Sequence, residues 1–407
     1  METPTPGRRI YLDYAASTPL DEEVREKMEP YFSIHFGNPG GLYEEGRIAK
    51  EAVESARASV ATSLSAHARE IIFTSGGTES NALGILGLLS YLEHSEKRAL
   101  GNMHIITSAI EHPSAFAVCK ELASRGAQVS FIGVSEKGIL NLNELKEALQ
   151  HNTMLVSVMY ANNEIGTIQP IKEVARIIKE HRKKNNTVFP YFHIDASQVP
   201  SYLDVRVEPL GVDLMTLDAQ KIYGPKGIGV LYKRTNTPLL PLFPGGKQER
   251  GFRTGTENVP LIVGMAESLR LAIEKREHEV ARLSELRDYF VKEVLEKIPG
   301  TALNGDSAQR IANNANFYIP GVDNEWLVML LDARGIAIGS KSACQPAEVK
   351  NSHVVLALGK DVAHAKSSFR FTMGRKTKKE DLDYVVQIMS EVVSQAQHKV
   401  EEREAVV

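Results

Sequence analysis

The sequence is poor in cysteine, and this limits the chemistry open to the chain. Its two cysteines, Cys119 and Cys344, stand far apart among 407 residues, and neither belongs to a CxxC pair. A disulfide framework or a cysteine-based zinc site therefore does not fit, and no metal site is expected. Any thiol chemistry must use one cysteine at a time.

Long apolar runs and a strong charge of one sign are also missing. No apolar stretch approaches the length of about 20 residues that spans a bilayer. The first residues, METPTP, lack the basic and apolar regions of a secretion signal, so a cytoplasmic location without membrane contact is expected. The formal net charge is −3 with both signs interspersed, so we expect no direct binding of nucleic acid.

The sequence does contain a repeated alternation of short apolar runs with helical patterns. The predicted strands are residues 70–74, 104–107, 128–134, 154–160, 192–194 and 213–217. Helical periodicity occurs at residues 46–64, 140–150 and 171–183. This alternation predicts a mostly parallel sheet of the α/β class.

Two domains are expected, because the chain exceeds the roughly 250–300 residues at which a single core stops growing. A long helical pattern covers residues 258–298 and ends at Pro299-Gly300, and shorter mixed elements follow it. We therefore place a boundary near residue 260. Residues 21–259 form the predicted large domain, and residues 260–407 form a smaller α+β domain.

The segment TSGGTESN, residues 74–81, follows a predicted strand and opens a helix. Free backbone N–H groups and the helix dipole make such a turn an anion site. Gly77 lets the backbone approach the anion closely, and the Thr78 hydroxyl adds a donor. The segment lacks the lysine of a Walker loop and the spacing of GxGxxG. A phosphate site is one interpretation, and a capped turn without a ligand is the other.

Polar side chains follow three further predicted strands. His112 comes soon after the run at 104–110, Asn163 follows residues 154–160, and Asp195 and Gln198 follow residues 192–194. Ligands of open α/β sheets bind outside the carboxyl ends of the strands. A buried aspartate needs a cation or a donor, and a protonated ring nitrogen is one such partner. His112 and Asp195 also allow purely structural interpretations.

Lys221 and Cys344 are the candidate nucleophiles. Lys221 lies between two strand-like runs, and desolvation lowers the pKa of a lysine among apolar neighbours, giving the neutral amine that attacks aldehydes. Lys226 in the same loop is an ordinary solvated lysine. Cys344 lies in a polar loop without apolar periodicity, where a cation such as Lys341 would favour its thiolate. Cys119 lies in a helical pattern and is expected in the core.

Together and in this order, these motifs resemble the cysteine desulfurases related to NifS and IscS, in the class-V aminotransferase superfamily. The likeness runs from YLDYAASTP at residues 11–19 to RFTMGR at residues 370–375. It implies a homodimer with the fold of type I pyridoxal-phosphate transferases, in which a mostly parallel seven-stranded sheet forms the large domain. It also implies that the N-terminal segment, residues 1–20, associates with the small domain.

The resemblance further implies roles for individual residues. The implied catalytic groups are the Schiff-base lysine Lys221, the sulfur-accepting Cys344 and His112, which stacks on pyridoxal 5′-phosphate. The implied cofactor ligands are Asp195 for the ring nitrogen, Gln198 for the phenolic oxygen, Gly77, Thr78 and Gln220 for the phosphate, Asn163, and Thr256 supplied to the neighbouring subunit. Asn163 and Arg370 are implied to hold the substrate carboxylate, which suits the fork geometry of a guanidinium.

The implied activity converts L-cysteine to L-alanine and leaves sulfur as a persulfide on Cys344, for transfer to an acceptor protein in iron–sulfur cluster assembly or tRNA thiolation. A selenocysteine lyase, an ordinary class-V aminotransferase and a catalytically silent scaffold for sulfur transfer remain alternatives. The chain departs from the family pattern at Asp218-Ala219-Gln220, where relatives have Ser-Gly-His. A carboxylate facing phosphate is unfavourable, so Asp218 is expected to turn away or to pair with a base.

Overall fold

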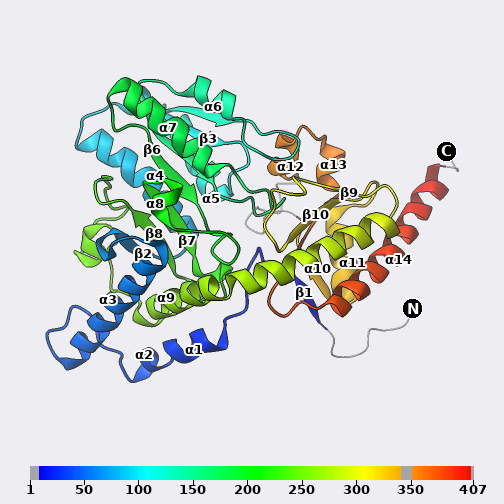
Figure 1. Cartoon of the computed structure of the whole chain (residues 1–407), viewed down its shortest axis with the longest axis horizontal. Helices are drawn as coiled ribbons and strands as arrows, with labels where there is room; N and C mark the ends of the chain where they lie inside the picture. The colour runs from blue at the N-terminus through cyan, green and yellow to red at the C-terminus, as the bar shows by residue number, and fades with distance from the viewer. Residues whose placement is uncertain (1–8, 341–350, 405–407) are drawn as a thin grey trace.

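The computed structural model describes residues 9–340 and 351–404, with side chains described up to residue 395. A seven-stranded sheet with the order β2-β8-β7-β6-β5-β3-β4 forms the centre of its larger part (Figure 1). The strands are β2 (Ile71–Thr74), β3 (His104–Ser108), β4 (Gln128–Ile132), β5 (Thr153–Met159), β6 (Tyr191–Asp195), β7 (Leu214–Asp218) and β8 (Gly229–Lys233). Only β8 runs against its neighbours, so the predicted mostly parallel sheet is confirmed.

All six strands predicted from apolar runs are present, each within two residues of its predicted ends. Every residue of β5 and β7 is buried. This is the pattern of strands covered by helices on both faces, which explains why they appear in the sequence as nearly continuous apolar runs.

Helices cover both faces of this sheet. Because successive strand residues point to opposite faces, Ile71 and Phe73 pack with helices α3 (Glu44–Leu64), α7 (Ile171–Asn185) and α9 (Val259–Glu274). Ile72 packs on the other side with α4 (Gly77–His94) and α5 (Pro113–Ser124). Cys119 of α5 is fully buried in this second cluster, as predicted. The helices α6 (Leu142–Ala148) and α8 (Val207–Leu210) also belong to the larger part of the molecule, which contains the seven-stranded sheet.

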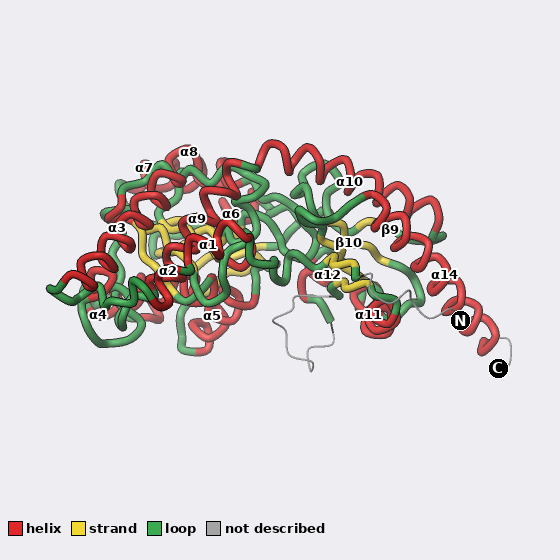
Figure 2. Tube along the Cα trace, turned by 90° about the horizontal axis from the view of Figure 1, so that it is seen from below, coloured by secondary structure: helices red, strands yellow, loops and turns green. Residues whose placement is uncertain are grey.

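A second unit lies beside the large sheet (Figure 2). In it, β1 (Ile10–Leu12) pairs in parallel with β11 (Ile336–Ile338), so the N-terminal strand joins the C-terminal part of the chain. Three antiparallel strands, β9 (Ala302–Leu303), β10 (Asn314–Tyr318) and β12 (Ser368–Thr372), form its other sheet. Its helices are α10 (Arg276–Lys297), α11 (Asn324–Ala333), α12 (His353–Ala357), α13 (Val362–Lys366) and α14 (Lys379–Glu404).

The long helical pattern at residues 258–298 consists of two consecutive helices, α9 and α10, which meet at Lys275. Ile262 and Leu269 of α9 are buried in the core of the large sheet, whereas Phe290 and Val294 of α10 belong to the core of the second unit. The two helices thus link the two cores, and the domain boundary near residue 260 stays a prediction. Two short helices, α1 (Glu22–Met28) and α2 (Pro30–Ser33), precede α3.

None of the described helices combines the length and the apolar character needed to cross a bilayer.

Candidate active site

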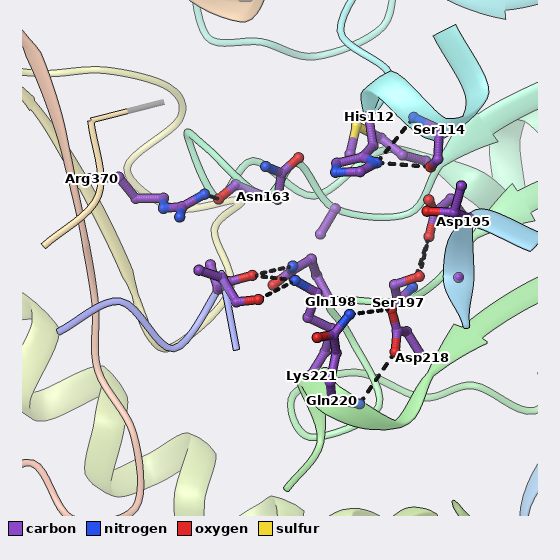
Figure 3. Close-up of a pocket in the computed structure, with 16 residues that line it drawn as sticks. His112, Ser114, Asn163, Asp195, Ser197, Gln198, Asp218, Gln220, Lys221 and Arg370 are labelled. Atoms are coloured by element: carbon purple, nitrogen blue, oxygen red, sulfur yellow. Dashed lines mark hydrogen bonds between the residues drawn. The ribbon is translucent and has the colours of Figure 1, made fainter. Parts of the chain in front are cut away.

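Most of the residues singled out in the sequence converge on one pocket (Figure 3). The empty space in and in front of the pocket is about 590 Å³, which includes space open to solvent. The predicted residues that line it are Gly77, Thr78, His112, Asn163, Asp195, Gln198, Gln220, Lys221 and Arg370. Several of them lie at the ends of β2, β5, β6 and β7 or a few residues beyond, where ligands of parallel sheets are expected.

Lys221 ends a short 3₁₀ turn, η3 (Ala219–Lys221), that directly follows β7. Its Nζ donates hydrogen bonds to the carbonyl oxygens of Ala15 at 2.9 Å and Ala16 at 2.6 Å. Gln198 also donates to the Ala15 carbonyl, at 3.0 Å. The N-terminal segment therefore forms one wall of the pocket, and it brings the lysine and the glutamine side by side.

Asp195 ends β6 and is almost fully buried, with uncharged donors around its carboxylate. Oδ1 accepts from the Ser197 backbone N–H at 3.0 Å and from the Ser197 hydroxyl at 2.6 Å, and Oδ2 accepts from Asn81 Nδ2 at 2.7 Å. These bonds meet the need for donors that burial imposes on the carboxylate. Sequence reasoning did not find Asn81, although its position one helical turn after Gly77 places both residues on one side of α4.

His112 is the N-cap of α5, and its ring is hydrogen-bonded to Ser114. Its Nδ1 accepts from the Ser114 backbone N–H at 3.2 Å and pairs with the Ser114 hydroxyl at 2.8 Å. Burial lowers the pKa of His112, so the ring is neutral at pH 7. A neutral imidazole that lines the pocket can present its face to an aromatic ligand.

Arg370 lies in the middle of β12, and only 1% of it is exposed. One terminal nitrogen donates to Asp13 Oδ1 at 2.6 Å, and the other donates to the Asn163 carbonyl at 3.2 Å. Among the described residues, its Nε has no hydrogen-bond partner. Arg370 lines the pocket, where its guanidinium suits a carboxylate supplied by a ligand.

The turn before α4 has the features of an anion cradle. Gly76 is the N-cap and provides no side-chain cap, so the first backbone N–H groups of α4 remain open to a ligand. A Cβ at Gly77 would lie 3.1 Å from Ser197 Oγ and 3.2 Å from Asp218 Oδ2. Gly77 therefore lets the Ser197 and Asp218 side chains lie closer to the turn than a larger residue at position 77 would.

Asp218 does not turn away from the pocket, and it forms no ion pair with a base among the residues that the structure describes, so both expectations were wrong. It ends β7 and lines the same pocket as Gly77. Its carboxylate accepts hydrogen bonds from the Gln220 backbone N–H at 3.2 Å and from the Gln220 side-chain amide at 3.1 Å. The reason is local, because an aspartate at the start of a 3₁₀ turn caps the free N–H groups of that turn.

Thr256, a predicted site residue, is not among the described residues that line this pocket. Thr256 is exposed and lines separate hollows on the surface together with Glu257 and Asn258. Cys344 lies outside the described residues, as does Lys341. The pocket also has lining residues that sequence reasoning missed, which are Ala15, Ala16, Ser114, Met159, Ala161 and Ser197.

Comparison with known proteins places this architecture in one family. The class-V aminotransferase family matches residues 10–385. The cysteine desulfurase IscS of Dictyoglomus turgidum is 42% identical over 386 residues, which cover 95% of each chain.

Solved structures agree with this assignment. A NifS-like protein has a TM-score of 0.86 at 32% identity, over 95% of this chain and 100% of that one. A structure of SspA in complex with cysteine has a TM-score of 0.76 at 33% identity, over 89% of this chain and 98% of that one. The chain therefore belongs to the class-V aminotransferase family and, within it, to the cysteine desulfurases.

Proposed function

We propose that this cysteine desulfurase binds pyridoxal 5′-phosphate and L-cysteine in the pocket around Lys221, and that it releases L-alanine while sulfur passes to Cys344. The observation that carries the proposal is the convergence of Lys221, Asp195 and Arg370 on one pocket. The amine would hold the cofactor aldehyde, the carboxylate would face the ring nitrogen, and the guanidinium would hold the substrate carboxylate. The same set of groups argues against a catalytically silent scaffold.

The chain's own residues fit the cofactor at three points. The uncapped first turn of α4 would take the phosphate, Asp195 would face the ring nitrogen, and Lys221 would hold the aldehyde. His112 would stack on the ring, and Gln198 would donate to the phenolic oxygen. Bound pyridoxal phosphate supplies an aldehyde that joins to amines and a ring that withdraws electrons from the substrate.

The substrate carboxylate would be held by Arg370 and Asn163. The place of Arg370 in the lining of the pocket supports this role, because a guanidinium suits a carboxylate. Asp13 and the Asn163 carbonyl already hold the two terminal nitrogens, so the guanidinium is oriented before the substrate arrives. A preoriented cation of this kind stabilises the bound substrate without paying further side-chain entropy. The related SspA has been captured with cysteine.

Proton and sulfur transfer would fall to Lys221 and Cys344. The Lys221 amine would remove the proton from the substrate Cα and later return one to the alanine side chain. The Cys344 thiolate would form a bond to the substrate sulfur as the carbon–sulfur bond breaks, with the bonding electrons left on carbon. Alanine and a Cys344 persulfide are the products, and an acceptor protein for iron–sulfur cluster assembly or tRNA thiolation would take the sulfur.

Replacing Cys344 with alanine tests the sulfur-transfer step. We expect the variant to bind the cofactor normally but to form no protein persulfide, and to produce alanine from cysteine about 10²-fold or more slowly, because the nucleophile is absent. Alanine is measured by chromatography, and the persulfide by mass spectrometry of the intact chain after incubation with cysteine.

Cys119 provides the matched control for that experiment. Burial raises the pKa of its thiol to about 12, so it stays a thiol at neutral pH and cannot act as a nucleophile. Cys119→Ala is expected to keep persulfide formation, at some cost in thermal stability from the cavity in the core. A persulfide on Cys119, or normal alanine production by Cys344→Ala, would contradict the proposed role of Cys344.

Asp218 makes a distinctive prediction about cofactor affinity. Its carboxylate lines the pocket beside Gly77, so it lies close to the proposed phosphate. We expect Asp218→Ser to bind pyridoxal phosphate about tenfold more tightly, because like charges in a partly desolvated site repel. Titration of the cofactor-free protein, followed by visible absorbance, measures the change. Pyridoxal, which lacks the phosphate, should bind both proteins equally, and an equal gain for both ligands would contradict the electrostatic explanation.

A homodimer is the proposed assembly. Five large apolar side chains between residues 32 and 43 are 57–97% exposed, namely Phe32, Ile34, Phe36, Leu42 and Tyr43. An exposed apolar group of this kind is typical of an interaction site. Phe36 lines the same hollow as Thr256, so a second subunit covering this face would meet Thr256. We also propose that the protein is located in the cytoplasm.

A further inference from the structure

A line of hydrogen bonds behind the pocket connects His112 with Asp195. Asn81 Nδ2 lies 2.7 Å from Asp195 Oδ2 and 2.8 Å from Ser114 Oγ. Ser114 Oγ in turn lies 2.8 Å from His112 Nδ1. Asp195, Ser114 and His112 are labelled in Figure 3. Asn81 is completely buried in α4, and its side chain bridges β6 and the start of α5. The two groups that would flank the cofactor ring are thus joined by two uncharged side chains.

The direction of each bond in this line is determined by chemistry. A carboxylate accepts only, so the Asn81 atom facing Asp195 must be its amide nitrogen. That nitrogen has two hydrogens, and it donates one to Asp195 and the other to the Ser114 oxygen. Asn81 Oδ1 has no hydrogen-bond partner in the described parts of the chain. The side chain therefore keeps a costly unpaired acceptor while both of its donors face the site.

The next link sets the tautomer of His112. Ser114 Oγ already accepts from Asn81, and its single hydrogen points to His112 Nδ1. The Ser114 backbone N–H, which can only donate, reaches the same nitrogen at 3.2 Å. Two donors thus meet at Nδ1, which must be unprotonated. Since the ring is neutral, its proton is on Nε2.

We propose that Asn81 and Ser114 are positioning residues of this site, which together hold His112 as the Nε2–H tautomer and hold the Asp195 carboxylate in place through uncharged donors. The inference rests on the proposed function and extends it to two residues to which the sequence analysis assigned no role. A neutral His112 adds no positive charge next to Lys221. The described donors to Asp195 are Asn81 and Ser197, and neither of them is a cation.

The tautomer can be measured without cofactor or substrate. Nitrogen-15 NMR of histidine-labelled, cofactor-free protein at pH 7, with the His112 signals identified by their absence in His112→Gln, is expected to show a protonated Nε2 and a hydrogen-bonded, unprotonated Nδ1. In Ser114→Ala and in Asn81→Leu, the Nδ1 signal should shift toward that of a nitrogen without a hydrogen bond. Ser114→Thr, which keeps the hydroxyl, should retain the wild-type signal.

Ser80→Ala is the matched control, because Ser80 is buried next to Asn81 on α4. Its hydroxyl bonds to Thr74 at 2.7 Å and takes no part in the line of hydrogen bonds from His112 to Asp195. The substitution should leave the His112 signals unchanged even if it lowers the unfolding temperature. A wild-type His112 with its proton on Nδ1 or on both nitrogens would overturn the proposal. So would Nδ1 signals that are unchanged in both Ser114→Ala and Asn81→Leu.

Turnover provides a second readout. Asn81→Leu is expected to lower kcat for alanine formation by about 10- to 100-fold, as for the loss of a hydrogen bond to a charged group, with little change in KM. A rise in KM alone would contradict a positioning role. If the wild-type protein forms no alanine from cysteine, the proposed function fails, but the NMR result still decides the tautomer.

Discussion

Replacing Lys221 with alanine is expected to abolish the visible absorbance of the protein mixed with pyridoxal phosphate and to lower the turnover of cysteine by about 10³-fold or more. The amine at this position is the group that would hold the aldehyde and then carry the substrate proton, so the substitution removes both functions. Absorbance spectra after gel filtration and chromatography of alanine measure the two effects. Added methylamine should restore part of the turnover by supplying a free amine.

Lys226 gives a control within the same loop. It is exposed, in contrast to Lys221, so Lys226→Ala should change turnover by less than about twofold. Because the Lys221 amine also bonds to the Ala15 and Ala16 carbonyls, thermal unfolding of both variants must be compared to exclude a loss of folding. If folded Lys221→Ala stayed yellow and still produced alanine at the wild-type rate, the assignment of Lys221 would be abandoned.

Asp195→Asn is expected to lower kcat by about 10²-fold or more with the cofactor still bound. The substitution keeps the shape of the side chain but removes the negative charge that would face the ring nitrogen. Ser197 can still donate to the remaining carbonyl oxygen. Steady-state kinetics and the amount of bound cofactor are measured on the same preparation, so that lost binding is separated from lost turnover.

Asp204→Asn serves as its counterpart on the surface. Asp204 pairs with Arg206 at 2.7 Å in a partly exposed ion pair, which contributes little to stability, and it does not line the pocket. Its kinetics should match those of the wild type. An Asp195→Asn variant with an unchanged kcat would show that the charge of Asp195 plays no part in the reaction.

Much of the large sheet could be predicted because its strands are buried on both faces. Burial of β5 and β7 makes their apolar runs continuous, and the apolar periodicity of α3 and α7 follows from packing on one side of the sheet. The division of residues 258–298 into α9 and α10 could not be predicted. Lys275 carries no helix-breaking signal, and the break appears only because the two helices serve different cores.

The candidate site was predictable wherever a polar residue follows a strand. Asn163, Asp195 and Gln198 were found in this way, because strand ends in parallel sheets share one edge. Asn81 and Ser114 were missed, since each lies in the first turns of a helix, where a polar residue is ordinary. The orientation of Asp218 was predicted wrongly from repulsion by a ligand alone, because the carboxylate also caps its own 3₁₀ turn.

By itself, the sequence determined the class of fold, the positions of most strands and the set of side chains available for chemistry, because local periodicity and chain order carry that information. Only the tertiary structure decided which of those side chains meet. Lys221 contacts Ala15 across 206 residues of sequence, and Arg370 pairs with Asp13 across 357. Such contacts depend on how two separately formed cores are set against each other, and no local pattern of residues records that arrangement.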